Sequence, residues 1–188
     1  MGAGLAALGI YNIWDLQKKR KALEKDVHNL NAMGQQLMKE ARRNHKVLMH
    51  TIRVQVKLDL ELALEDPLGQ DELGLYSEEL SDAIRDYQPT DDGIAAWAYN
   101  VDAFLKYRLK EISEAYVAVK RSIERQNEKN GDAYYNAACF AAQLRLFDES
   151  VEHSKKAIHA SHHFRVYAQT DGDFDPIRSY PPFEQLVS

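Results

Sequence analysis

Two segments in the C-terminal half of this 188-residue chain repeat at a spacing of 35 to 36 residues. Residues 99–101 (Tyr-Asn-Val) match 135–137 (Tyr-Asn-Ala), 112–115 (Ile-Ser-Glu-Ala) match 147–150 (Phe-Asp-Glu-Ser), and 122–123 (Ser-Ile) match 157–158 (Ala-Ile). A unit of this length accommodates two helices and a turn, and such units bury their apolar faces by stacking on one another. The repeat therefore predicts an all-α module of helical hairpins.

The residue types within the repeat indicate how the helices pack. Small residues such as Ala115 and Ser150 stand where helix backbones approach, while Ile112 and Phe147 fill the space between helices. The dipeptide Asn130-Gly131 is typical of a helix-ending turn between the two units. We expect the first unit over Ala95–Gln126 and the second over Asp132–Ser161, with the turn inside the first unit one residue longer.

The second unit resembles a tetratricopeptide (TPR) repeat. Residues 134–140 are similar to the first TPR helix and residues 147–150 to the start of the second. The first unit departs from the pattern, since Asp102 stands near the usual glycine. Residues 168–178 and 182–186 resemble the segment that closes many bacterial TPR arrays. The resemblance covers residues 90–188 and implies that the exposed end of the stack is covered by Phe174, Ile177, Phe183 and Leu186.

The resemblance implies a function in protein recognition. TPR arrays bind peptides or helices on the concave face that the first helix of each unit builds. The matching positions here are Tyr99, Asn100, Lys106, Tyr107, Tyr135, Asn136 and Gln143. The alternative is that Tyr99 and Tyr135 belong to the core and the others to the surface. The fold alone does not identify the partner, because one fold hosts many ligands.

The N-terminal block, residues 1–50, has a heptad pattern. Leucines recur every seven residues at d positions, where Asn44 then interrupts them, and a second apolar series stands at a positions, three residues before d positions; the two series are Leu16, Leu23, Leu30 and Leu37, and Ile13, Val27, Ala41 and Leu48. Arg20 and Gly34 interrupt the second series. The pattern predicts either a long amphipathic helix that packs on its own chain or a coiled coil, which would imply self-association.

In the connecting region, residues 51–89, the sequence does not decide whether the first element is a strand or a helix. Apolar residues alternate with polar ones over residues 52–64, which is typical of a half-buried strand. The abundance of Leu, Lys, Glu and Ala favours a helix instead. We expect a short helix over Ser77–Tyr87, a boundary at Pro89 and Thr90 as the cap of the following helix.

Charge and cysteine content restrict the partners and the compartment. The net charge of −5 argues against nucleic acid as the main partner, because phosphate binding needs a basic face. A single cysteine, Cys139, excludes an intramolecular disulfide and favours the cytoplasm; it stands in an apolar run and is expected to be buried. Residues 2–14 carry no charge and precede a basic run at residues 18–21. They predict a buried helix, an interfacial anchor or the end of a membrane helix.

No residue pattern predicts catalysis, a cofactor or a metal site. His153, His159, His162 and His163 cluster in the sequence, but no zinc-site motif accompanies them. Two functions follow. The first is a non-enzymatic protein–protein interaction scaffold that uses the TPR-like module at residues 90–188. The alternative is a structural subunit of an oligomeric assembly, in which the heptads and residues 52–64 make intermolecular contacts.

Overall fold

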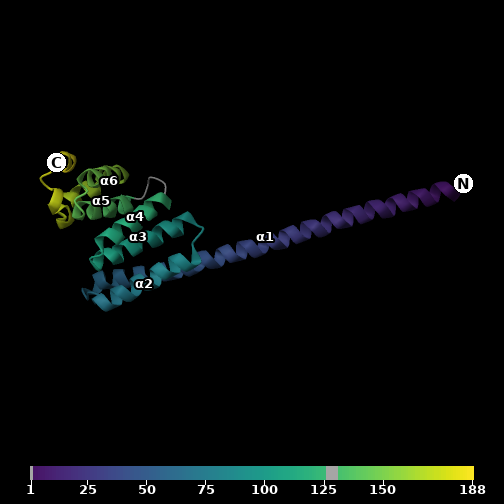
Figure 1. The fold of residues 1–188 in the computed structure, drawn as a ribbon, viewed down its shortest axis with the longest axis horizontal. Coiled ribbons are helices and arrows are strands. Elements are labelled where there is room, and N and C mark those ends of the chain that lie inside the picture. Colours follow the sequence, from purple (N-terminus) through teal and green to yellow (C-terminus); the bar gives the residue numbers. More distant parts are fainter. Residues whose placement is uncertain (1, 126–130) are drawn as a thin grey trace. The chain divides into compact units, whose positions relative to one another are not determined.

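A computed structural model describes the backbone of residues 2–125 and 131–188 and the side chains of residues 16–125 and 131–188. All regular elements in these ranges are helical (Figure 1). They are α1 (Gly2–Leu64), α2 (Gln70–Tyr87), α3 (Asp92–Arg108), α4 (Ile112–Arg125), α5 (Gly131–Gln143), α6 (Phe147–Ala160), α7 (His163–Thr170), the 3-10 helix η1 (Gly172–Ile177) and α8 (Pro181–Val187). The expected all-α class is thus confirmed for the described residues.

The strand alternative for residues 52–64 is wrong, because α1 continues through them to Leu64. Val54 and Leu58 are buried one turn apart on one side of the helix, whereas Ile52, Val56 and Leu60 are exposed. The alternation therefore distributes apolar residues around a helix. A strand would also need a partner, and the described residues contain no second strand.

The chain divides into two units, Met1–Arg42 and Arg43–Ser188, which are described separately. In the first unit the heptad leucines of α1 are exposed. The predictions for residues 2–14 concern side chains outside the described range. None of the helices in the described part of the chain combines the length and apolar character needed to cross a membrane.

The second unit begins with a core shared by α1, α2 and α3. Val47, Val54 and Leu58 of α1 pack with Leu80 of α2 and Leu105 of α3. The predicted helix over Ser77–Tyr87 is present but begins earlier, at Gln70, because Gly69 ends the loop and Leu73 and Tyr76 extend the buried face. The residues just before α3 are also attached to α1, because the Asn44 side chain accepts a hydrogen bond from the Thr90 amide at 2.7 Å.

The cap of α3 is Asp91, and the prediction of Thr90 is wrong by one position. The Asp91 carboxylate accepts from the Ile94 amide at 2.9 Å, as a capping side chain does. Thr90 does not take this role because its backbone amide and its hydroxyl are bonded to Asn44. A contact between segments distant in sequence therefore overrides the local preference.

Two helix pairs, α3 with α4 and α5 with α6, follow in the second unit (Figure 1). Their turns are equivalent: Lys110 and Arg145 both have positive φ, and the next residue's amide bonds back into the first helix in each pair. The expectation of a longer turn in the first pair is therefore wrong. Helix ends repeat at 35 residues while Tyr99 and Tyr135 are 36 apart, so the additional residue lies within α3.

The C-terminal segment covers the end of these pairs, as expected. Phe174, Ile177 and Phe183 are fully buried in one cluster with residues of α5 and α6, and Leu186 is partly buried against this cluster. Gly131 begins α5, and a Cβ at this position would lie 2.4 Å from the Phe164 ring, so close packing requires glycine. Asn130, expected in the turn before it, lies outside the described residues.

Candidate functional site

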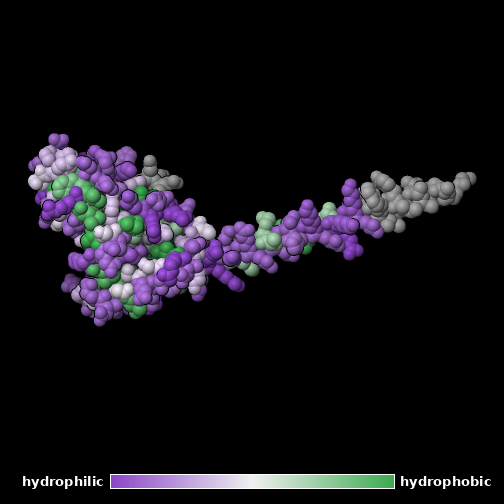
Figure 2. All heavy atoms as spheres, viewed as in Figure 1, coloured by the Kyte–Doolittle hydropathy of each residue, from purple (hydrophilic) through white to green (hydrophobic). Residues whose placement is uncertain are grey.

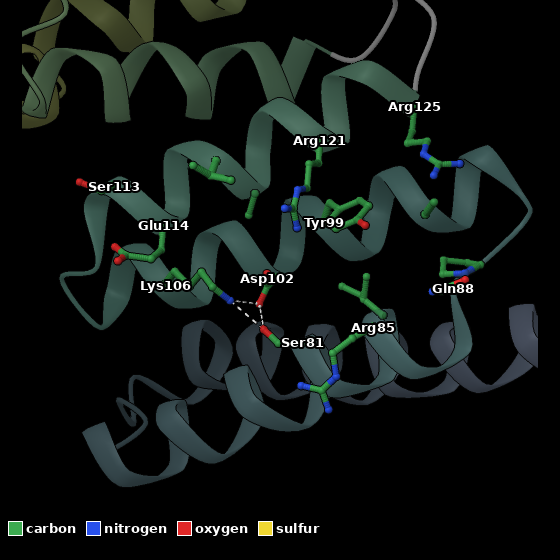
Figure 3. A pocket seen from close by; sticks show the side chains of 15 residues that line it. Ser81, Arg85, Gln88, Tyr99, Asp102, Lys106, Ser113, Glu114, Arg121 and Arg125 are labelled. Carbon is green, nitrogen blue, oxygen red and sulfur yellow. Dashed lines mark hydrogen bonds and ion pairs between the residues drawn. The ribbon is translucent and has the colours of Figure 1, made fainter.

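A groove of about 670 Å³ opens across α2, α3 and α4 (Figure 3). Its size falls in the range of ligand-binding clefts. Apolar side chains from all three helices contribute to its surface, which combines Ile84, Ala95, Tyr99, Val117 and Ala118. Four cations and two carboxylates also line it, namely Arg85, Lys106, Arg121, Arg125, Asp102 and Glu114. The groove thus has a local positive surplus in a chain of net charge −5.

A buried polar network joins two of the helices beneath the groove. The Lys106 ammonium donates to the Asp102 carboxylate and, at 2.8 Å, to the Ser81 hydroxyl, which in turn donates to Asp102 (Figure 3). Asp102 and Lys106 are one helical turn apart on α3, and Ser81 lies on α2. The network fixes α2 against α3 and holds the Lys106 side chain in one direction.

Arg121 is the cation placed most clearly for a ligand. Its guanidinium lies 5.9 Å from the centre of the Tyr99 ring, in a cation–π arrangement (Figure 3). The other arginines have carboxylate partners: Arg125 bonds to Asp92 at 3.2 Å and Arg85 to Asp82 at 2.8 Å. Hydrogen bonding to Asp86, with the nearby charge of Asp82, raises the pKa of Arg85 above its ordinary value. Arg121 therefore presents positive charge beside an aromatic face, whereas the charges of Arg85 and Arg125 are offset by their carboxylate partners.

The structure divides the residues predicted as a binding face into two groups, those that line the groove and those that are bonded to other parts of the chain. Tyr99 and Lys106 line the groove. Asn100 accepts a hydrogen bond at 3.1 Å from Asn136, which connects α3 to α5. The remaining three side chains contact the C-terminal segment: Tyr107 donates to Asp173, Tyr135 donates to Asp171, and Gln143 donates to the Asp173 carbonyl.

The second group is occupied by the chain itself. Tyr135 stacks on Phe164 with ring centres 5.1 Å apart, and Tyr107 stacks on Phe140 at 5.2 Å. Burial, and then the bond to Asp173, raises the pKa of Tyr107, while burial raises the pKa of Asp173 itself. These tyrosines stay protonated and donate hydrogen bonds to carboxylates of the C-terminal segment. The bonds attach this segment to the helix pairs.

Metal binding has little support among the described residues. One group of ligand types converges there, Cys139 with Asp171 and Asp173. The carboxylates already accept from Tyr135 and Tyr107, and burial raises the pKa of the Cys139 thiol well above its ordinary value. A protonated thiol is a poor metal ligand and a poor nucleophile. Cys139 is buried among apolar residues, as expected.

His153 gives a prediction for the pH dependence of stability. Burial, with the charge of Lys156, lowers the pKa of this imidazole, whose Nε2 lies 3.1 Å from the Tyr116 hydroxyl. In the unfolded chain this histidine binds a proton near pH 6.5, whereas in the folded chain it does so only at lower pH. The free energy of unfolding is therefore retained above pH 6.5 and decreases as the pH falls toward the folded-state pKa. Urea denaturation from pH 7.5 to 5 should show this loss, and His153→Gln should reduce it.

The matched control for His153 is the exposed His159 on the same helix. His159→Gln should leave the pH dependence as in the unmodified chain. If both variants have the same pH profile as the unmodified chain, His153 does not have the depressed pKa that its burial implies.

Three cations of the groove were missed from the sequence. Arg85 belongs to α2, and Arg121 and Arg125 belong to α4. The resemblance directed attention to the first helix of each unit, whereas these residues come from the helices that flank α3. Arg121 and Arg125 are four residues apart, which places them on one face of α4 but does not by itself indicate a binding site. The site depends on the packing of α2 beside α3, which the sequence does not specify.

No family model matches the chain, and no curated protein is significantly similar to it.

Proposed function

We propose that this chain is a non-enzymatic protein-interaction scaffold built on a TPR-like helical repeat, and that the groove across α2, α3 and α4 holds an acidic, partly apolar peptide segment of a partner protein. The observation that carries the proposal is the placement of Arg121 over Tyr99 in a groove with four cations and two carboxylates. Carboxylates of a ligand complement these cations, and its apolar side chains fit against Tyr99 and Val117.

The TPR-like character of the module rests on the arrangement of its helices. Two helix pairs with equivalent turns follow one another, a hydrogen bond from Asn136 to Asn100 joins their first helices, and the C-terminal segment covers their apolar end. The face first expected to bind the ligand is bonded to that segment at Tyr107, Tyr135 and Gln143. This favours the α2–α3–α4 groove as the open surface of the module.

The test uses two fluorescent dodecapeptides with the same leucines, one carrying glutamates and the other lysines at its polar positions. Fluorescence anisotropy should show that the full chain binds the glutamate peptide and not the lysine peptide. Arg121→Glu should weaken binding by at least about tenfold, because a like charge then faces the ligand. Lys46→Glu, an equal charge change at an exposed position of α1 outside the groove, should leave binding unchanged.

Two outcomes would count against the groove. If neither peptide binds, the acidic-peptide proposal is wrong. If Arg121→Glu and Lys46→Glu weaken binding equally, the attraction depends on overall charge rather than on the groove, and the proposed site is wrong.

A second candidate function is a structural subunit of an oligomeric assembly. The exposed leucines of α1 favour it, because large apolar side chains in a regular row on a helix surface mark an interaction site. Within residues 52–64, Val54 and Leu58 are buried in their own chain, whereas Ile52, Val56 and Leu60 remain exposed and could make such contacts. The two functions are compatible in one protein.

A further inference from the structure

The apolar row on the N-terminal half of α1 has no cover within the described chain. Leu16, Leu23, Leu30 and Leu37 are 62 to 66 % exposed, and Val27 is 56 % exposed. Figure 2 shows green, hydrophobic places along the mostly purple, hydrophilic surface of the described part of this helix. Helices in proteins derive most of their stability from packing of an apolar face, so this segment is expected to pack against a partner.

The spacing of the row indicates another helix as that partner. The leucines occupy every seventh position, the d positions of a heptad, and the a positions hold Val27 and Ala41 together with Arg20 and Gly34, which interrupt the apolar series. The series spans residues 16–41, almost four heptads, which is the length over which a heptad pattern is typical of a coiled coil. Leucine at d with a β-branched residue at a favours two parallel strands.

The helix surface is already hollowed in the way that such packing requires. A shallow groove on α1 is lined by Leu16, Lys19, Arg20, Leu23, Glu24 and Val27. In a parallel coiled coil a side chain at a fits among d, g, a and d of the facing helix, and one at d fits among a, d, e and a. Leu16, Lys19, Arg20 and Leu23 form the first kind of hole, at positions d, g, a and d. Arg20, Leu23, Glu24 and Val27 form the second kind, at positions a, d, e and a.

The charges beside the row complement a second copy of the same segment. In a parallel pair in register, each g position faces the e position of the next heptad on the other helix. Lys19 then faces Glu24, and Glu40 faces His45; Asp26 faces the neutral Asn31, and Met33 faces Met38. No like charges meet at these positions. Glu24 also accepts from Arg20 of its own helix at 2.8 Å, which helps to accommodate the arginine at a.

We propose that residues 16–41 of α1 form a parallel, in-register two-stranded coiled coil with a second copy of this chain. The dimer places two copies of the C-terminal module in one particle. This inference rests on α1 alone and stands whether or not the α2–α3–α4 groove binds an acidic peptide.

Light scattering of the purified full chain gives the first measurement. We expect a mass of twice the 21.5 kDa of one chain. Leu23→Asp combined with Leu30→Asp should halve the mass, because charges in the seam cannot pack. Lys25→Asp combined with Lys39→Asp, at exposed f positions on the outer side of the same helix, should leave the dimer intact. Circular dichroism should show that the C-terminal helices remain folded in both variants.

Cross-linking then tests the orientation. Leu30→Cys should form a disulfide-linked dimer under mild oxidation, because d positions face one another only in a parallel, in-register pair. Lys25→Cys, on the outer side, should not, and Cys139 is buried and should not contribute. A dimer that does not cross-link at position 30 would contradict the proposed register.

Two further results would overturn the proposal. One is a full chain that remains monomeric at tens of micromolar. The other is a monomer that sediments with phosphatidylserine vesicles and loses this property in the double Leu→Asp variant, which would assign the leucine row to a membrane surface.

Discussion

Phe174→Ala is expected to lower the free energy of unfolding of the C-terminal module by about 3–5 kcal/mol, the range for a buried phenylalanine. The Phe174 side chain is fully buried, stacks on Phe183 with ring centres 4.9 Å apart and meets Tyr135 edge-on at 5.7 Å. Its loss opens a cavity where the C-terminal segment covers the last helix pair. Urea denaturation followed by circular dichroism, at one protein concentration for all variants, measures the change.

The control for Phe174 is Val166→Ala in α7, because Val166 is 60 % exposed. An exposed substitution of this kind should change the free energy by no more than about 0.5 kcal/mol. A loss below about 1 kcal/mol for Phe174→Ala would show that the C-terminal segment is not packed on the helix pairs as described.

Asp102→Ala is expected to cost about 2–3 kcal/mol, because it leaves the Lys106 ammonium without its carboxylate partner. Asp102 has a side chain 8 % exposed and Lys106 one 17 % exposed, so water compensates the stranded charge only in part. Removing one member of a buried pair costs about 3–5 kcal/mol, and the partial exposure of Lys106 places this pair at or below the lower end. The same denaturation experiment measures it.

The double variant Asp102→Ala with Lys106→Met separates two explanations of that loss. Replacement of both charges by apolar groups is often nearly neutral, so most of the lost stability should return. Lys155→Ala provides the exposed comparison: its pair with Glu152 is short, at 2.6 Å, but both side chains are more than half exposed, so the change should stay below about 1 kcal/mol. If the double variant is as unstable as Asp102→Ala, the loss comes from packing and not from the stranded charge.

The elements that the sequence predicted well are those that a local pattern specifies. The 35-residue repeat placed α3 to α6, because helical hairpins need small and large residues at regular intervals. Phe174, Ile177 and Phe183 were predicted as cover for the stack from the resemblance of the tail to segments that close repeat arrays, since the apolar end of a stack must be covered. Burial of Cys139 followed from its apolar neighbours.

The features that could not be predicted depend on contacts between distant segments. Alternation over residues 52–64 is ambiguous by itself, and burial of Val54 and Leu58 against α2 decides for a helix. Thr90 does not cap α3 because it is hydrogen-bonded to Asn44, which lies 46 positions earlier in the sequence. Two sides of the groove come from α2 and α4, and only the packing of α2 on α3 brings Ser81 to Asp102. Gly131 was interpreted as a turn residue, whereas the nearby Phe164 ring requires it.

The most direct measurement of the proposed function is an amide chemical-shift map of the isotope-labelled chain during titration with the glutamate dodecapeptide. If the peptide occupies the groove, the shifts concentrate at Tyr99, Lys106 and Arg121, and Asn136 and Gln143 are unchanged. Shifts concentrated at Asn100, Asn136 and Gln143 would place the ligand on the face of the first helices instead. The absence of any shift at saturating peptide would contradict the acidic-peptide groove.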